Sequence, residues 1–138
     1  MTAIQRVATI FGVLFVLVGL AGFTPAGLGV MQMDHSGAGM LFGMFPVNAL
    51  HNVVHLLFGA WGLWAGRTAV RSLTYALGSG AAYLLLGVLG MFTNSLFGIV
   101  PIGGYDVHLH LVLAGILAGC GFVAMWFPSE APVSEQAS

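Results

Sequence analysis

Charged side chains are scarce in this chain of 138 residues, and lysine is missing altogether. Only 5% of the residues are charged, against about a quarter in an ordinary water-soluble domain. So few charges cannot cover a water-exposed surface, and a net charge of -1 without a basic patch excludes a nucleic-acid-binding protein. The sequence also lacks a phosphate-binding loop, a nucleotide fingerprint and a Ser-His-Asp arrangement. An enzyme is therefore not favoured, and only a His/Asp cluster described below leaves that class open.

Cysteine is nearly absent as well. Cys120 stands alone inside an apolar run, so the chain cannot form an internal disulfide. Glycine, by contrast, is abundant, with 21 residues that fall mostly inside apolar segments. Small residues in such segments allow membrane helices to approach one another closely. The composition predicts closely packed helices in a membrane.

Long apolar runs make up most of the sequence. A hydrocarbon core of about 30 Å is crossed by about 20 apolar residues in a helix. Four stretches fit this length, at about 5–23, 47–65, 73–92 and 106–127, and they form a transmembrane domain over 1–127. Residues 128–138 are polar, and we expect a disordered cytoplasmic tail there. The first stretch also has features of a signal peptide, but the repeat described below indicates a retained helix.

The basic residues set the expected orientation. Arg6, Arg67 and Arg71 fall on one side of a four-helix arrangement, and the two loops on the other side contain no Lys or Arg. Because basic residues favour the cytoplasmic side, both termini are expected in the cytoplasm of a multi-pass inner-membrane protein. Tryptophans near the same side fit interfacial anchors, namely Trp61, Trp64 and Trp126.

An internal repeat joins the two halves. LFGMFPVNALHNVVH at 41–55 aligns without a gap over LFGIVPIGGYDVHLH at 96–110. The preceding segments, GVLFVLVGLAGF at 12–23 and GAAYLLLGVLGM at 80–91, also align, at a different offset because the first outward loop is longer than the second. The alignment pairs Pro46 with Pro101, His51 with Asp106, and His55 with His110. We therefore predict an all-α integral membrane four-helix bundle built from two tandem helical hairpins, related by a pseudo-twofold axis.

Polar residues gather on one face of the second and fourth stretches. The second carries Asn48, His51, Asn52 and His55 at spacings of a single helical stripe. The fourth carries Asp106 and His110 one turn apart, whereas His108 falls on the opposite side. Both stripes continue as small residues, including Gly59, Gly62, Ala114 and Ala118. We expect these two helices to meet along the stripes near the outer membrane face.

Ionisable residues inside a membrane are costly and usually functional. His51, His55, Asp106 and His110 are the candidate ligands of a divalent transition metal (Zn, Cu or Fe), with Asn48 and Asn52 orienting them. Two other interpretations remain open. The cluster can serve only to hydrogen-bond helices in an accessory or structural subunit. His55 and His110 can alternatively be the axial ligands of a small b-type cytochrome, although no Arg is expected nearby for haem propionates.

A second group of candidate metal ligands lies in the first outward loop. The segment contains Met31, Met33, Asp34, His35 and Met40. Thioether and imidazole groups favour copper, particularly Cu(I). The alternative is an amphipathic loop in which methionine fills apolar space.

The segment LFGMFPVNALHNVVHLLFGAWGLWAG resembles the hallmark of the bacterial domain-of-unknown-function 4383 family, whose members are four-helix membrane proteins. Its pattern N-A-x-H-N-x-x-H falls on residues 48–55, and D-x-x-L-H falls on residues 106–110. Val107 stands where members often have Asn. The resemblance implies the membrane fold and the polar cluster but no activity. We expect the lipid bilayer as a partner, and either a membrane-protein partner or a homo-oligomer beside it.

Overall fold

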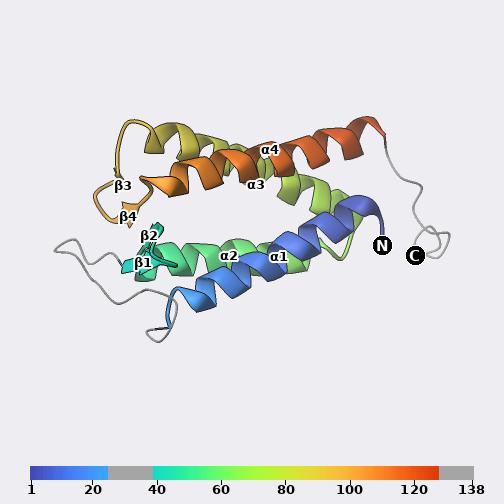
Figure 1. The fold of residues 1–138 in the computed structure, drawn as a ribbon. Helices are drawn as coiled ribbons and strands as arrows, with labels where there is room; N and C mark the ends of the chain where they lie inside the picture. Colours follow the sequence, from blue (N-terminus) through green and yellow to red (C-terminus); the bar gives the residue numbers. More distant parts are fainter. Residues whose placement is uncertain (25–38, 128–138) are drawn as a thin grey trace.

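A computed structural model describes residues 1–24 and 39–127 (Figure 1). Four α-helices form most of this part of the chain, and they confirm the predicted all-α bundle. Their bounds are α1 (Ala3–Ala21), α2 (Ala49–Ala65), α3 (Ala69–Gly90) and α4 (Tyr105–Trp126). By length and composition α1, α3 and α4 can each cross a membrane, and α2 is an apolar helix of 17 residues. The predicted tail at 128–138 and the methionine-rich group, apart from Met40, lie outside the described residues.

Local hydrogen bonds decide where the helices begin. The side chain of Asn48 accepts from the backbone N–H of His51, so α2 begins at Ala49 rather than at 47. The hydroxyl of Thr68 accepts from the backbone N–H of Arg71, so α3 begins at Ala69 rather than at 73. A very short connection therefore joins α2 to α3 at the arginine-bearing end of the bundle.

The helices pack most closely as two hairpins, α1 with α2 and α3 with α4. Gly12 of α1 lies so near α2 that an added Cβ would be 2.6 Å from the backbone nitrogen of Leu63. Gly80 of α3 lies in the same way 2.8 Å from the backbone nitrogen of Ala118 on α4. Leu63 and Ala118 are equivalent in the alignment that pairs His55 with His110, so both hairpins pack in one register.

The small residues of α2 have a different partner from the one expected. Gly59 and Gly62 face Val16 and Gly12 of α1, and Ala118 faces Gly80 of α3. These small-residue faces therefore close the contacts within each hairpin instead of joining α2 to α4. Small residues let helix backbones approach closely, and here the approaches of Gly12 to Leu63 and of Gly80 to Ala118 lie within the hairpins.

Large side chains fill the space between the two hairpins. Phe15, Tyr75, Tyr83 and Leu117 are buried there at exposures of 0–4%. The rings of Phe15 and Tyr83, which are equivalent in the repeat alignment, stack with centroids 5.3 Å apart. The bundle is thus two tightly packed hairpins separated by an aromatic layer.

Two small β-hairpins, which were not predicted, close one end of the bundle. β1 (Gly39–Leu41) pairs antiparallel with β2 (Phe45–Val47), and β3 (Ser95–Leu96) pairs antiparallel with β4 (Val100–Pro101). The repeated Leu-Phe-Gly forms both turns, with positive φ at Phe42 and Gly43 and again at Phe97 and Gly98. Two successive positive φ values are those of a type I′ turn, which suits the twist of a β-hairpin.

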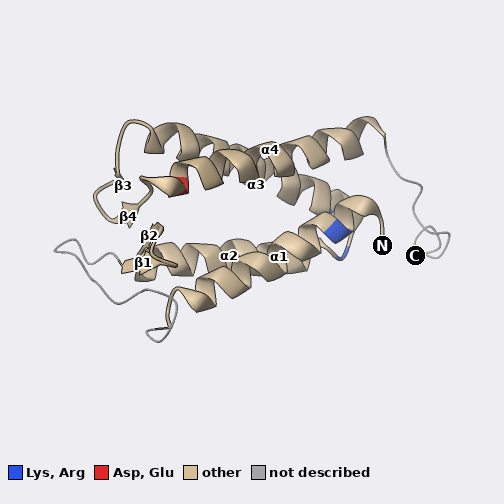
Figure 2. Cartoon of the chain, viewed as in Figure 1, with Lys and Arg blue, Asp and Glu red and all other residues tan. Residues whose placement is uncertain are grey.

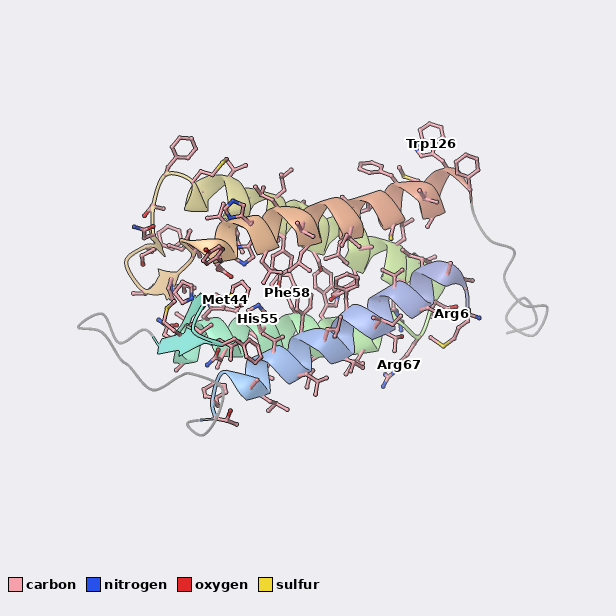
Figure 3. All side chains as sticks on the ribbon, viewed as in Figure 1. Arg6, Met44, His55, Phe58, Arg67 and Trp126 are labelled. Atoms are coloured by element: carbon pink, nitrogen blue, oxygen red, sulfur yellow. The ribbon has the colours of Figure 1, made fainter. Side chains whose placement is uncertain are left out.

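The few charges lie at opposite ends of the bundle. Figure 2 shows the basic residues at the end where α2 joins α3, and the buried acidic residue beside the β-hairpins. Figure 3 shows Arg6 and Arg67 at one end and Met44 at the other, with His55 toward the Met44 end. The polar cluster therefore occupies the end away from the arginines.

Candidate metal centre

The polar residues predicted as a cluster are buried at the end that carries the β-hairpins. α2 supplies His51 and His55, and α4 supplies Asp106 and His110. Their side chains are almost fully enclosed, with residue exposures between 2% and 7%. His108 is exposed and takes no part in the cluster. Enclosed ionisable groups need partners, so their contacts indicate what the cluster can hold.

Three of the four residues form a compact group. His51, Asp106 and His110 each offer one ligand atom, and these atoms lie within 4.8 Å of one another. Within the group, Nε2 of His110 is 3.6 Å from Oδ2 of Asp106, which is longer than an ordinary hydrogen bond. Oδ2 of Asp106 and Nδ1 of His110 have no hydrogen-bond partner among the described residues. Two imidazoles and a carboxylate are thus close together, and Oδ2 of the carboxylate is left without a hydrogen bond.

The β3–β4 hairpin fixes the orientation of His51. Nδ1 of its ring lies 3.0 Å from the carbonyl oxygen of Pro101. A carbonyl oxygen can only accept, so the ring must donate a proton from Nδ1. Nε2 then carries the free lone pair, as in metal-binding histidines whose other nitrogen donates to a carbonyl. Pro101 was not predicted as a site residue, and the only signal for it was its pairing with Pro46 in the repeat.

His55 lies beside this group but outside it. Its ring stacks on His51 with a centroid distance of 4.7 Å and on Phe15 with a distance of 5.8 Å. Nδ1 of His55 is buried and has no hydrogen-bond partner among the described residues. The predicted four-residue set therefore divides into a group of three and one neighbouring imidazole.

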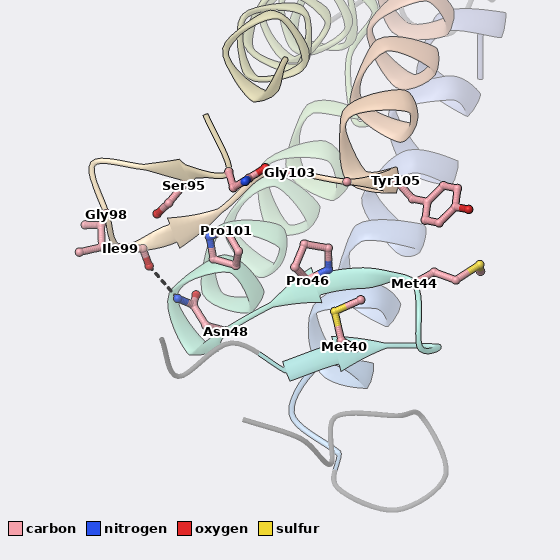
Figure 4. A pocket seen from close by; sticks show the side chains of 12 residues that line it. Met40, Met44, Pro46, Asn48, Ser95, Gly98, Ile99, Pro101, Gly103 and Tyr105 are labelled. Atoms are coloured by element: carbon pink, nitrogen blue, oxygen red, sulfur yellow. Dashed lines mark hydrogen bonds between the residues drawn. The ribbon is translucent and has the colours of Figure 1, made fainter. Parts of the chain in front are cut away.

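The two asparagines have separate surroundings. Asn48 caps α2, and its Nδ2 donates to the carbonyl oxygen of Ile99 at 2.6 Å, which links α2 to the β3–β4 hairpin (Figure 4). Asn52 is buried against Gly22 at the end of α1, and its Oδ1 has no described partner. Neither recorded contact of Asn48 reaches an imidazole ring. Asn48 therefore holds the backbone at the start of α2 and in the β3–β4 hairpin, and this backbone in turn positions His51.

Tyr83 is a neighbour that the motif search missed. Its ring belongs to the aromatic layer and lies 5.2 Å from that of His110. It occupies the position equivalent to Phe15, which contacts His55 in the same way. The repeat alignment pairs Phe15 with Tyr83, and this pairing is the sequence signal that points to Tyr83.

Two cavities adjoin the cluster. One, of about 530 Å³, lies between the two β-hairpins and is lined by Met40, Met44, Asn48, Pro101 and Tyr105 among others (Figure 4). The second, of about 210 Å³, is enclosed by α1, α4 and the β1–β2 hairpin, and it reaches His51, His55 and Asp106. Of these two cavities, the second contacts the cluster directly, whereas the first is lined by none of its four residues.

Comparison with known proteins places the chain in a family. The family model described as domain of unknown function (DUF4383) matches residues 5–123, which include α2, α3 and most of α1 and α4, and the chain belongs to this family. No curated protein and no solved structure matches the chain. The family description carries no activity, so a function has to be argued from the cluster itself.

Proposed function

We propose that this membrane protein binds one divalent transition metal through His51, Asp106 and His110. The observation that carries the proposal is the approach of three buried ligand atoms, from two helices, to within 4.8 Å of one another. The Nδ1 proton of His51 is used on the Pro101 carbonyl, which leaves Nε2 directed to a ligand. This proposal narrows the four-residue set predicted from the sequence to three ligands with His55 beside them.

The donor set favours particular metals. Two imidazole nitrogens and one carboxylate oxygen suit Zn²⁺, Cu²⁺ or Fe²⁺ rather than Ca²⁺ or Mg²⁺, which prefer oxygen ligands. Three protein ligands also leave a coordination position open, as at catalytic and exchange sites, whereas structural zinc sites are usually closed by four. The proposed ion is therefore one that a further ligand can reach.

The proposed location is the outer face of the bacterial inner membrane. Arg6, Arg67 and Arg71 lie at the end of the bundle opposite the cluster, and basic residues favour the cytoplasmic side. With residues 1–127 as one transmembrane domain, both termini would be cytoplasmic. The same separation gives the b-type cytochrome no support, because none of the three arginines is near His55 or His110 to pair with haem propionates.

The proposed bundle arose by duplication of one helical hairpin. Support comes from the matching turns at Phe42–Gly43 and Phe97–Gly98, and from the shared register of the glycine contacts. In the repeat alignment, His51 is equivalent to Asp106 and His55 is equivalent to His110. A metal at the meeting point of the two copies would need both, so neither hairpin alone would hold it.

Elemental analysis of the detergent-purified protein tests the metal. We expect close to one metal per chain in the wild type, and loss of that metal in His51→Ala, Asp106→Ala and His110→Ala. His108→Ala is the matched control on the same helix, because His108 is exposed and outside the group. A metal content equal in His108→Ala and His110→Ala would refute the proposed site. A Soret band in the visible spectrum would instead support haem.

A second candidate is a structural or accessory subunit. It is favoured by two hydrogen bonds that join the halves at the cluster end, His51 to Pro101 and Asn48 to Ile99. In that case the variants would lose thermal stability to the same extent with and without a chelator present. A metal centre predicts that the chelator lowers the stability of the wild type only, because binding to the folded state is what stabilises it.

A further inference from the structure

The 210 Å³ cavity on the side of the bundle is shaped for a small ring compound that enters from the membrane. Its walls are mostly apolar and aromatic, and they include four phenylalanines: Phe11, Phe15, Phe42 and Phe45. Leucines of α1 and α4 complete the walls, namely Leu14, Leu109 and Leu113. Leu14, Phe42 and Leu109 are 37–54% exposed, on an apolar surface that faces lipid in a membrane bundle. The cavity therefore opens between α1 and α4 toward the acyl chains.

The inner end of the cavity is polar. His55 and Asp106 both line it, and both keep an unpartnered buried atom, Nδ1 of His55 and Oδ2 of Asp106. A buried polar atom without a partner is costly, so a ligand that supplied a hydrogen bond there would be favoured. A neutral imidazole can donate to a carbonyl or accept from a hydroxyl, depending on which nitrogen carries the proton.

The dimensions select the class of ligand. An apolar cavity of about 150 Å³ already binds benzene, so 210 Å³ has room for a substituted ring or a fused pair of rings rather than a phospholipid headgroup. Phenylalanine side chains favour a flat ring by offset or edge-to-face contact. The polar end requires an oxygen on that ring, and the lateral opening allows an apolar tail to remain in the bilayer.

We propose that this cavity binds the ring of a membrane-dissolved quinone or quinol, with a ring oxygen hydrogen-bonded to His55. The aromatic walls hold the ring, the opening between α1 and α4 receives the tail, and His55 serves both the carbonyl and the hydroxyl form. His110 does not line the cavity. His51 and Asp106 belong both to the cavity lining and to the proposed metal group, whereas His55 belongs to the cavity alone, so His55 and His110 distinguish the two proposals.

Titration of detergent-purified protein with 2-methyl-1,4-naphthoquinone tests the proposal. We expect saturable binding of one quinone per chain to the wild type. Leu14→Trp should weaken binding about tenfold or more, because the larger ring fills the opening. Leu17→Trp is its matched control on α1, since Leu17 is 56% exposed and does not line the cavity. Equal binding by these two variants would overturn the proposed position.

The polar contact has its own test. His55→Phe keeps an aromatic ring but removes both nitrogens, and we expect the quinone to bind about threefold to tenfold more weakly. Naphthalene, which lacks the ring oxygens, should bind the wild type more weakly than the quinone and should not distinguish His55→Phe from it. Equal affinities for naphthalene and the quinone would mean a purely apolar cavity and would overturn the proposal.

The metal and the quinone are separated by two variants. His110→Ala should lose the metal and keep its quinone affinity, whereas Leu14→Trp should lose the quinone and keep the metal. Loss of quinone binding in His110→Ala would make the quinone a ligand of the metal and overturn the cavity as described. Unchanged metal content in Leu14→Trp also shows that this variant is folded.

Discussion

Substitution of Gly12 by alanine tests the packing that holds the first hairpin together. A Cβ at this position would lie 2.6 Å from the backbone nitrogen of Leu63 and 2.9 Å from the carbonyl carbon of Gly62. Ordinary van der Waals contact begins at 3.4 Å, so the helices would have to separate by up to 0.8 Å (3.4 − 2.6). Backbone atoms cannot rotate away as a side chain can, and α1 and α2 must therefore move apart.

The expected cost combines two opposing effects. Overpacking of a close contact costs about 1–3 kcal/mol. Alanine is preferred over glycine inside a helix by about 1 kcal/mol, which offsets part of that cost. Gly12→Ala should therefore be destabilised by up to about 2 kcal/mol. Gly115→Ala is the control, because no atom lies within 4 Å of an added Cβ there, and it should gain up to about 1 kcal/mol.

The free energy of unfolding in mixed detergent micelles measures both variants. We expect Gly115→Ala to be the more stable of the two by about 1–3 kcal/mol. If Gly12→Ala unfolds at the same denaturant concentration as Gly115→Ala, or at a higher one, the close approach of α1 and α2 is refuted. Gly80→Ala should behave like Gly12→Ala, since its Cβ would meet the backbone of Ala118 at 2.8 Å.

Three further outcomes are expected. Asn48→Ala should lower the unfolding free energy by about 1 kcal/mol or more and reduce the metal content. Both effects are expected because the α2 cap and the link to the β3–β4 hairpin are lost, whereas Asn48→Asp should retain the cap. Phe97→Asn should raise thermal stability in detergent, because asparagine accepts positive φ more readily and Phe97 is 87% exposed, and a lowered melting temperature would contradict this. In a chain lacking Cys120, an impermeant maleimide added to intact cells should label Thr93→Cys but not Arg67→Cys, and the reverse pattern would invert the topology.

The helices and the site were predictable from the sequence for different reasons. Long apolar runs with almost no charge permit little besides membrane helices, so the number of helices followed from composition. The cluster followed from the helical stripe of His51 and His55 and from the alignment that places Asp106 and His110 at equivalent positions. Rare residues such as proline and histidine carried that alignment, because they seldom recur at equal spacing by chance.

The β-hairpins and the partners of the small residues were not predictable in this way. Strands of two or three residues are too short for an alternating pattern. Phenylalanine is also not among the residues that usually indicate a turn with positive φ. A glycine stripe indicates close approach but does not say which helix approaches. Gly59 and Gly62 were therefore assigned to α4, although their contacts are with α1.

Which of His51 and His55 contacts Asp106 depends on the position of each along α2 relative to α4. The spacing of residues within one helix does not give that position. One turn separates the two residues by about 6 Å along α2, since each residue rises about 1.5 Å. Only the level at which α4 stands beside α2 decides which imidazole meets Asp106. The β3–β4 hairpin contributes to that level, through the bonds from Asn48 to Ile99 and from His51 to Pro101. This unpredicted hairpin thus helps to bring His51, rather than His55, to Asp106.

The repeat has an imidazole, His51, in its first half and a carboxylate, Asp106, at the equivalent position of its second half. This difference changes the net charge around the proposed ion. A divalent ion held only by neutral imidazoles would place two positive charges in a buried site, and the arginines at the other end offer no compensation. Asp106, at the position equivalent to His51, reduces that charge to one. Asp106→Asn therefore separates geometry from charge, because it keeps the size of the side chain and one oxygen while removing the negative charge. We expect it to bind the metal more weakly than the wild type and to lose more affinity than a variant of the exposed His108, as measured by competition with a chelator; equal affinity would show that the carboxylate charge is not what the site requires.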